Sequence, residues 1–188
     1  YENVNGVWTQ IGQDLEGDLA GNFFGWSVSL NYDGTILAIG SVYYNSSSGL
    51  VRVYENINGV WTQVGQDVNG TGGSFSQSIS LSSDGQTLAV GAPSSGSNNE
   101  GKVYIYNNLS ANWILNGQVI DGQLPLERFG KSVSLNSSGN IVAAGADDYL
   151  YPNNINEGET RVFGTSTPCS DLGCLDPLAL NFDPNATV

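Results

Sequence analysis

The sequence contains no histidine and no methionine, only two cysteines, and five lysine and arginine residues against 18 aspartate and glutamate residues. Without histidine, no side chain with an ordinary pKa near neutrality is present to activate a serine or cysteine nucleophile, so we expect no enzyme activity. The net charge of −13 disfavours nucleic acid and anionic membranes, which are bound by clusters of cations. No stretch reaches the roughly 18 consecutive apolar residues of a membrane-spanning helix, so we expect no membrane insertion.

What the chain does contain is enough apolar sequence for a core, since 39% of its 188 residues are apolar. Charged residues make up only 12%, and serine, threonine, asparagine and glycine replace them. The acidic residues are scattered and never form a run, which indicates an acidic surface and no acidic tail. A polar, weakly charged surface of this kind is common in secreted adhesive repeat proteins.

The strongest pattern is an internal repeat with a period of about 52 residues. The segment Tyr1–Asp14 returns almost unchanged as Tyr54–Asp67, and a degraded copy runs from Tyr106 to Trp113 with Gly117-Gln118 behind it. A fixed period of this length predicts a repeat architecture in which each unit buries its apolar faces against its neighbours.

Each repeat holds four short apolar segments in a fixed order, and each has the length and the Val, Ile, Tyr and Trp content of a β-strand. These segments are 27–30, 78–81 and 132–135; 36–40, 87–91 and 141–145; 50–54, 102–106 and 160–163; and the stretches from Trp8, Trp61 and Trp113 to the glycine four residues later. No stretch shows helical spacing of apolar residues over ten positions, so we predict no helix.

Glycine-containing turns connect these segments. The first and second segments are joined at Asp33-Gly34, Asp84-Gly85 and Ser138-Gly139, and the third and fourth at Asn5-Gly6 and Asn58-Gly59. Such pairs between two apolar runs indicate hairpins, because glycine accepts a positive φ. Four antiparallel strands per repeat, with the Trp segment outermost, predict an all-β fold of β-propeller blades. The serines that alternate with apolar residues in the first segment would let neighbouring sheets approach closely.

Residues 1–163 also resemble a known family. Phe24-Gly25 and Phe129-Gly130 open two repeats, and Val90-Gly91-Ala92-Pro93 lies in the second. This pattern resembles the FG-GAP repeat, the blade of integrin α-subunit propellers and of many bacterial secreted proteins. Phe75-Ser76 and Gly40-Ser41 depart from it. Family members often bind calcium in an Asp-rich loop after the first strand, but Asp33 and Asp84 are single acids here, so we expect plain turns and no metal.

The repeats set the expected domain organisation. An outer strand at 1–14 is followed by blades at about 24–67, 75–118 and 129–163, and residues 164–188 form a linker and the start of a Cys-containing module similar to one in Bacteroidota surface proteins. Because known propellers have roughly four to eight blades, we favour a fragment of a larger propeller, with Val7–Gly12 not paired to Thr160–Phe163. A closed three-unit body is the alternative.

The aromatic residues divide into anchors and candidate ligand contacts. Trp8, Trp61 and Trp113 occupy one equivalent position per repeat, so we expect them to be buried anchors. Trp26 has only polar equivalents, Gln77 and Lys131, and the long variable loops carry further tyrosines. The candidate ligand-binding residues are Trp26, Tyr43, Tyr44, Tyr149 and Tyr151. The one adjacent acidic pair, Asp147-Asp148, is interpreted as a solvated loop start.

The tail contains both cysteines. Cys169 and Cys174 are too few for a zinc site without histidine, so a disulfide in an oxidising compartment is the better interpretation. Two pairings are open: Cys169 with Cys174, or each with another residue, that of Cys174 lying past Val188. Asp176, Asp183 and Asn185 could contribute to a calcium site in the tail, and no other cofactor is expected.

These observations favour a non-enzymatic binding or adhesion module of a large secreted or cell-surface bacterial protein. Its partner would be a protein or glycan ligand on a surface, or other domains of the same protein. The alternatives are an accessory propeller of a carbohydrate-active enzyme whose catalytic domain lies outside this chain, and a structural spacer without a ligand.

Overall fold

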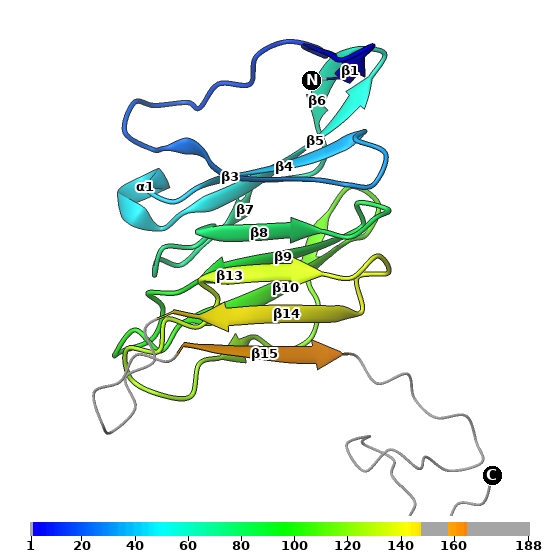
Figure 1. The fold of residues 1–188 in the computed structure, drawn as a ribbon. Helices are drawn as coiled ribbons and strands as arrows, with labels where there is room; N and C mark the ends of the chain where they lie inside the picture. The colour runs from blue at the N-terminus through cyan, green and yellow to red at the C-terminus, as the bar shows by residue number, and fades with distance from the viewer. Residues whose placement is uncertain (1, 148–157, 165–188) are drawn as a thin grey trace, which may run out of the picture.

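The computed structural model describes residues 2–147 and 158–164, and these form an all-β structure of several antiparallel sheets (Figure 1). The chain begins with a hairpin of β1 (Glu2–Val4) and β2 (Val7–Thr9). The first large sheet contains β3 (Phe24–Leu30), β4 (Ile36–Ser41), β5 (Leu50–Ile57), β6 (Val60–Gln63) and β7 (Val68–Asn69). The second contains β8 (Ser78–Leu81), β9 (Thr87–Ala92), β10 (Lys102–Asn108), β11 (Trp113–Leu115) and β12 (Ile120–Asp121). The third contains β13 (Ser132–Leu135), β14 (Ile141–Ala146) and β15 (Glu159–Gly164).

In the first two large sheets, the four main strands pair in chain order, and the strand that carries the tryptophan lies at the outer edge, as predicted. The sequence did not predict the two-residue strands β7 and β12, which pair with the first residues of β5 and β10. The prediction of no helix needs a small correction, because α1 (Tyr44–Ser47) lies in the loop between β4 and β5. Asn45 and Ser46 have positive φ, so this element is a tight turn of the loop.

Serine side chains join each sheet to the next. The hydroxyl of Ser27 donates to the carbonyl of Ser76 at 2.7 Å, and that of Ser78 donates to the carbonyl of Gly130 at 2.9 Å. Two further serine hydroxyls, of Ser29 and Ser80, accept the backbone N–H of Leu81 and Leu135 from the following repeat, both at 3.0 Å. The alternating serines therefore do more than allow close approach, since they also form hydrogen bonds from one repeat to the next.

The apolar residues between these serines form two cores, one for each junction between sheets. The first core packs β8 residues such as Ile79 and Leu81 against Ala38 and Val53 of the first sheet, and the second core surrounds Phe129. The equivalent residues at the two ends of the stack are uncovered. Val28 and Leu30 of β3 are 62% and 55% exposed, and Val162 of β15 is 66% exposed.

The two edges that could close a ring do not pair in the described residues, as expected. The hairpin β1–β2 pairs only with itself, and β15 pairs only with β14. Figure 1 shows the hairpin and β15 at opposite ends of the stack. The only helix among the described residues, α1, is far too short to cross a membrane.

The expected burial of the three repeated tryptophans is confirmed only for Trp113, which is 4% exposed; Trp61 is half-buried, and Trp8 is 67% exposed. The reason is that each tryptophan packs against the preceding repeat. The indole N–H of Trp113 donates to the carbonyl of Val64 at 3.3 Å, and that of Trp61 donates to Ile11 at 3.0 Å. Trp8 has no preceding repeat among the described residues, so its ring meets solvent.

Candidate functional site

Three exposed aromatic side chains gather at the start of β3. Trp26 and Tyr43, both predicted to contact a ligand, meet each other with ring centroids 6.3 Å apart. Phe23 joins them, with its ring centroid 6.0 Å from Trp26 and 5.1 Å from Tyr43. The three side chains remain between 46% and 56% exposed. We call Phe23, Trp26 and Tyr43 the aromatic cluster.

A bulged turn at the beginning of β3 holds this cluster in place. The backbone N–H of Trp26 donates to the carbonyl of Phe23 at 3.1 Å, and the pairing of β3 with β4 shifts register between Phe24 and Ser27. Tyr43 follows the end of β4, and its N–H donates to the carbonyl of Asn22 at 3.3 Å. The backbone of three neighbouring segments therefore fixes where the rings project.

Phe23 has a φ of 56°, in the left-handed region that bulky residues rarely adopt. Such a conformation costs on the order of 1 kcal/mol and persists only where the surrounding structure imposes it. No burial compensates for the cost, because the Phe23 ring is 56% exposed. This backbone conformation holds the Phe23 ring in solvent beside Trp26 and Tyr43.

The same turn recurs in the other two repeats with different side chains. The N–H of Gln77 donates to Ser74 and that of Lys131 donates to Arg128, at 3.0 and 3.2 Å, and Ser74 and Arg128 also have positive φ. The three positions of the aromatic cluster thus become Ser74, Gln77 and Ser94 in the second repeat. Because the turn forms without aromatic side chains, the fold does not require them at Phe23, Trp26 and Tyr43.

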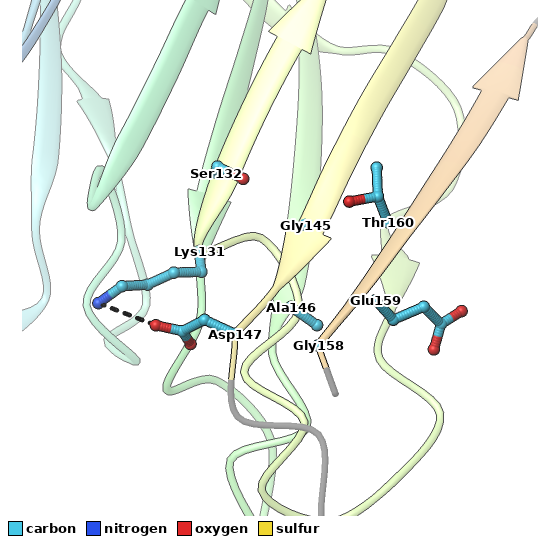
Figure 2. Close-up of a pocket in the computed structure, with 8 residues that line it drawn as sticks. All are labelled: Lys131, Ser132, Gly145, Ala146, Asp147, Gly158, Glu159 and Thr160. Atoms are coloured by element: carbon cyan, nitrogen blue, oxygen red, sulfur yellow. Dashed lines mark ion pairs between the residues drawn. The ribbon is translucent and has the colours of Figure 1, made fainter. Parts of the chain in front are cut away.

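In the third repeat, Arg128 and Lys131 occupy the positions of Phe23 and Trp26, and Lys131 lines a shallow pocket of about 350 Å³ (Figure 2). Lys131 Nζ lies 3.9 Å from Asp147 Oδ2, and Arg128 Nη1 lies 3.7 Å from Asp147 Oδ1. Glu159 lines the same pocket from the start of β15, and its side chain points away from Lys131 (Figure 2). Solvent-exposed ion pairs of this length are weak, so the pocket offers charge without a rigid arrangement of ligands.

The aspartates of the turns accept hydrogen bonds from residues of the same turn. Asp33 Oδ1 accepts from the N–H and the hydroxyl of Thr35, at 3.0 and 2.5 Å, and Asp84 Oδ1 accepts from the Ser82 hydroxyl at 2.6 Å. The hydrogen bond from the Thr35 hydroxyl lowers the pKa of Asp33, and the one from Ser82 lowers the pKa of Asp84. Both residues form turns, as expected. Among residues 2–147 and 158–164, no group of three or more His, Cys, Asp or Glu side chains could hold a metal ion.

The structure places the other predicted residues as follows. Tyr44 begins α1 and is half-buried, next to the aromatic cluster in sequence but outside its ring contacts. Tyr149, Tyr151, Cys169 and Cys174 lie outside the described residues, as does the possible calcium site of the tail. Phe23 was missed. The signal that could have revealed it is the one that pointed to Trp26, an aromatic residue whose equivalents in the other repeats are polar.

No family model matches the sequence, and no curated protein is similar to it. Among solved structures, the chain is similar to Kuenenia stuttgartiensis hydrazine synthase, with a TM-score of 0.47 and 16% identity over 85% of this chain and 36% of that one. It is also similar to Saccharomyces cerevisiae Sqt1, with a TM-score of 0.46 and 15% identity over 74% of this chain and 35% of that one. The chain thus spans about a third of the length of these two proteins, and likenesses this distant carry no functional argument.

Proposed function

We propose that this chain is a non-enzymatic binding module of a secreted or cell-surface protein, and that it contacts its ligand, a glycan or a protein, through the aromatic cluster. The observation that carries the proposal is the exposure of three mutually contacting rings on a turn that forms equally well without them. Large exposed apolar patches on monomeric proteins commonly mark binding sites.

We also propose that the three large sheets are consecutive β-propeller blades of the FG-GAP type. Two features of the packing support this arrangement. The first strand of each repeat lies against the first strand of the next, β3 against β8 and β8 against β13, while β6 and β11 lie at the outer edges of their sheets. Buried Phe75 and Phe129 occupy the position of the repeat's phenylalanine and anchor its first strand in the core.

The position of the aromatic cluster agrees with this function. It lies at the end of the sheets where β3 begins and β4 ends, the same end as α1 (Figure 1). Loops at one end of a rigid repeat scaffold are where such proteins usually carry recognition. Aromatic rings supply large contact areas with few rotatable bonds, so they bind at a low cost in conformational entropy.

The test is to screen the purified chain against a glycan array and against intact cells, and to repeat every positive result with Trp26→Ala and Tyr43→Ala. We expect each substitution to weaken binding by about tenfold or more, as for aromatic residues at interface centres. Tyr32→Ala is the matched control, because Tyr32 is 88% exposed but lies in the turn at the other end of β3. Binding that survives Trp26→Ala, or that is lost equally in Tyr32→Ala, would contradict the proposal, and so would a chain that binds nothing.

A further inference from the structure

The two junctions between successive outer strands are built in the same way. At the first, the side-chain amide of Gln13 pairs with the backbone of Trp61: Nε2 donates to the Trp61 carbonyl at 2.8 Å, and Oε1 accepts the Trp61 N–H at 3.0 Å. At the second, Gln66 pairs with Trp113 in the same manner, at 2.8 and 3.2 Å. The glutamine therefore acts as a receptor for the tryptophan strand of the following repeat.

A third glutamine is placed in the same way, and none of the residues 2–147 and 158–164 pairs with it. Gln118 follows Gly117 as Gln13 follows Gly12, yet its side-chain amide has no hydrogen-bond partner among the described residues. A groove of about 280 Å³ opens beside it, lined with apolar side chains from β13, β14 and β15, among them Leu135, Val142 and Phe163. We call Gln118 and this groove the open receptor.

The space around the glycine before each glutamine differs in the same way between the first two junctions and the third. A Cβ added at Gly12 would lie 2.8 Å from Cδ1 of Trp61, and one at Gly65 would lie 3.2 Å from Cδ1 of Trp113. A Cβ added at Gly117 would meet nothing within 4 Å. No described residue therefore occupies, at the third junction, the space that a tryptophan ring fills at the first two.

An unused tryptophan strand lies at the other end of the chain. Trp8 is 67% exposed, and in its hairpin it faces Asn3, as Trp61 faces Asn56 and Trp113 faces Asn108. The sequence Val7-Trp8-Thr9-Gln10 is identical to Val60–Gln63, which already fills the receptor of Gln13. The two end faces of the stack match as well, because exposed Val28 and Leu30 correspond to the residues Ile79 and Leu81, which pack on the preceding sheet.

We propose that the open receptor binds the Trp8 hairpin of a second copy of this chain. In that contact Trp8 takes the place of a third repeated tryptophan, with its backbone on the Gln118 amide and its ring in the groove. Val28 and Leu30 of the second copy then cover the exposed residues Ile141 and Val162 of the first. The third sheet has no outer strand among residues 2–147 and 158–164, and the hairpin of the second copy supplies one.

The chain's own hairpin cannot fill the receptor in this structure, because the two lie at opposite ends of the stack (Figure 1). A contact between different surfaces of two copies produces a ring if the rotation closes and a filament if it does not. Two copies bring together twice the three large sheets of one chain, within the roughly four to eight blades of known propellers. We therefore expect a closed dimer. This expectation of closure, unlike the contact itself, depends on the proposed propeller arrangement.

The experiment measures the mass of the full chain in solution by sedimentation over about a hundredfold range of concentration. Each copy has a net charge of −13, so added salt should strengthen association by screening the repulsion between copies. We expect Trp8→Ala and Gln118→Ala to weaken association by about tenfold or more. Both side chains are exposed in the single copy, so neither substitution should impair folding. Leu109→Ala is the matched control, because Leu109 is 57% exposed and lies just after β10 in the middle repeat, and this variant should associate like the unchanged chain.

Mixing the Trp8→Ala and Gln118→Ala variants tests whether the hairpin of one copy binds the open receptor of another. A Trp8→Ala chain keeps its receptor and a Gln118→Ala chain keeps its hairpin, so an equimolar mixture should form a pair that neither variant forms alone. Gly117→Ala should also prevent association, because its Cβ would occupy the place of the incoming ring, whereas Gly72→Ala, at a φ of +105° and with nothing within 4 Å, should not. A chain that stays monomeric throughout, or a mixture that restores no pair, overturns the proposal.

Discussion

Glu127 and Arg161 form an ion pair inside the third repeat, and the Glu127 side chain is completely buried. The second carboxylate oxygen of Glu127 accepts the backbone N–H of Gln123 and Leu124, at 2.5 and 2.9 Å, and the Arg161 guanidinium lies 4.1 Å from the ring centroid of Phe129. Arg52 occupies the position of Arg161 in the first repeat and pairs with Asp18 and Asp67. In the second repeat that position is Tyr104, and the cation lies two residues earlier, where Lys102 pairs with Asp121. Three of the five cations in the chain, Arg52, Lys102 and Arg161, thus lie on the third strand of a repeat and are paired with carboxylates.

Glu127→Ala should lower the free energy of unfolding by about 3–5 kcal/mol, because it leaves a partly buried guanidinium and two backbone N–H groups without their acceptor. Urea denaturation followed by tryptophan fluorescence measures this loss. Glu159→Ala is the control: Glu159 Oε1 lies 3.3 Å from Arg161, but the Glu159 side chain is 38% exposed, so its loss should cost at most about 1 kcal/mol. Equal losses in the two variants would contradict the importance of the buried pair.

The three repeated tryptophans should differ in their contribution to stability in the order of their burial. Trp113→Ala should cost about 3–5 kcal/mol, since Trp113 is 4% exposed and packs in the first core. Trp61→Ala should cost about half as much, and Trp8→Ala less than about 1 kcal/mol at concentrations where the chain is monomeric. Denaturation of the three variants under one set of conditions gives the comparison, and three equal losses would refute it.

Phe23→Gly should separate stability from binding. Glycine relieves the strain of the positive φ, worth on the order of 1 kcal/mol, and loses two ring contacts of similar total worth, so the melting temperature should stay close to that of the parent. Ligand binding should fall about tenfold or more. Phe75→Gly gives the contrast, because Phe75 is buried and its removal should cost several kcal/mol. A large drop in melting temperature for Phe23→Gly would show that the ring supports the fold.

Alkaline pH should destabilise the protein through Tyr106. Burial, with a smaller contribution from Tyr104, raises the pKa of Tyr106 to about 12. The unfolded chain therefore loses this proton first, at its ordinary pKa near 10, and the free energy of unfolding falls between about pH 10 and pH 12 before it levels off. Because the group is only partly buried, we expect a loss of about 1–2 kcal/mol.

The control for this titration is Tyr106→Phe, which should show a smaller alkaline decline. Some decline should remain, because burial also raises the pKa of Tyr54 and the Asp121 carboxylate raises that of Lys102. An unchanged pH profile in the variant would exclude Tyr106 as the source.

The strands and turns could be predicted from the sequence because each depends on a few neighbouring residues. Asp33-Gly34 and Asn58-Gly59 specify their hairpins locally, and the structure has strands on both sides of each. The exposure of Trp8 could not be predicted in this way. A tryptophan strand is buried only when the Gly-Gln pair of another repeat lies against it, and sequence similarity between Trp8 and Trp61 carries no information on whether that neighbour is present.

Two of the three residues of the aromatic cluster could be predicted from the sequence, and the third could not. Trp26 and Tyr43 stand out as aromatic residues in variable positions, but Phe23 directly precedes Phe24 and resembles part of the repeat's Phe-Gly signature. Only the left-handed backbone at Phe23, Ser74 and Arg128 shows that this residue points away from the core while the next one points inward.

The recurrent turn before the first strand has an evolutionary consequence. Its hydrogen bonds come from the backbone, from the N–H of Trp26, Gln77 or Lys131 to the carbonyl three residues earlier, so the side chains on it are free to mutate without unfolding their repeat. Duplication of such a unit followed by drift would give a family of surfaces with unchanged architecture. The side chains on this turn are aromatic in the first repeat, neutral in the second, and charged at Arg128 and Lys131 in the third, so each set could be transplanted onto the turn of another repeat to create a new specificity.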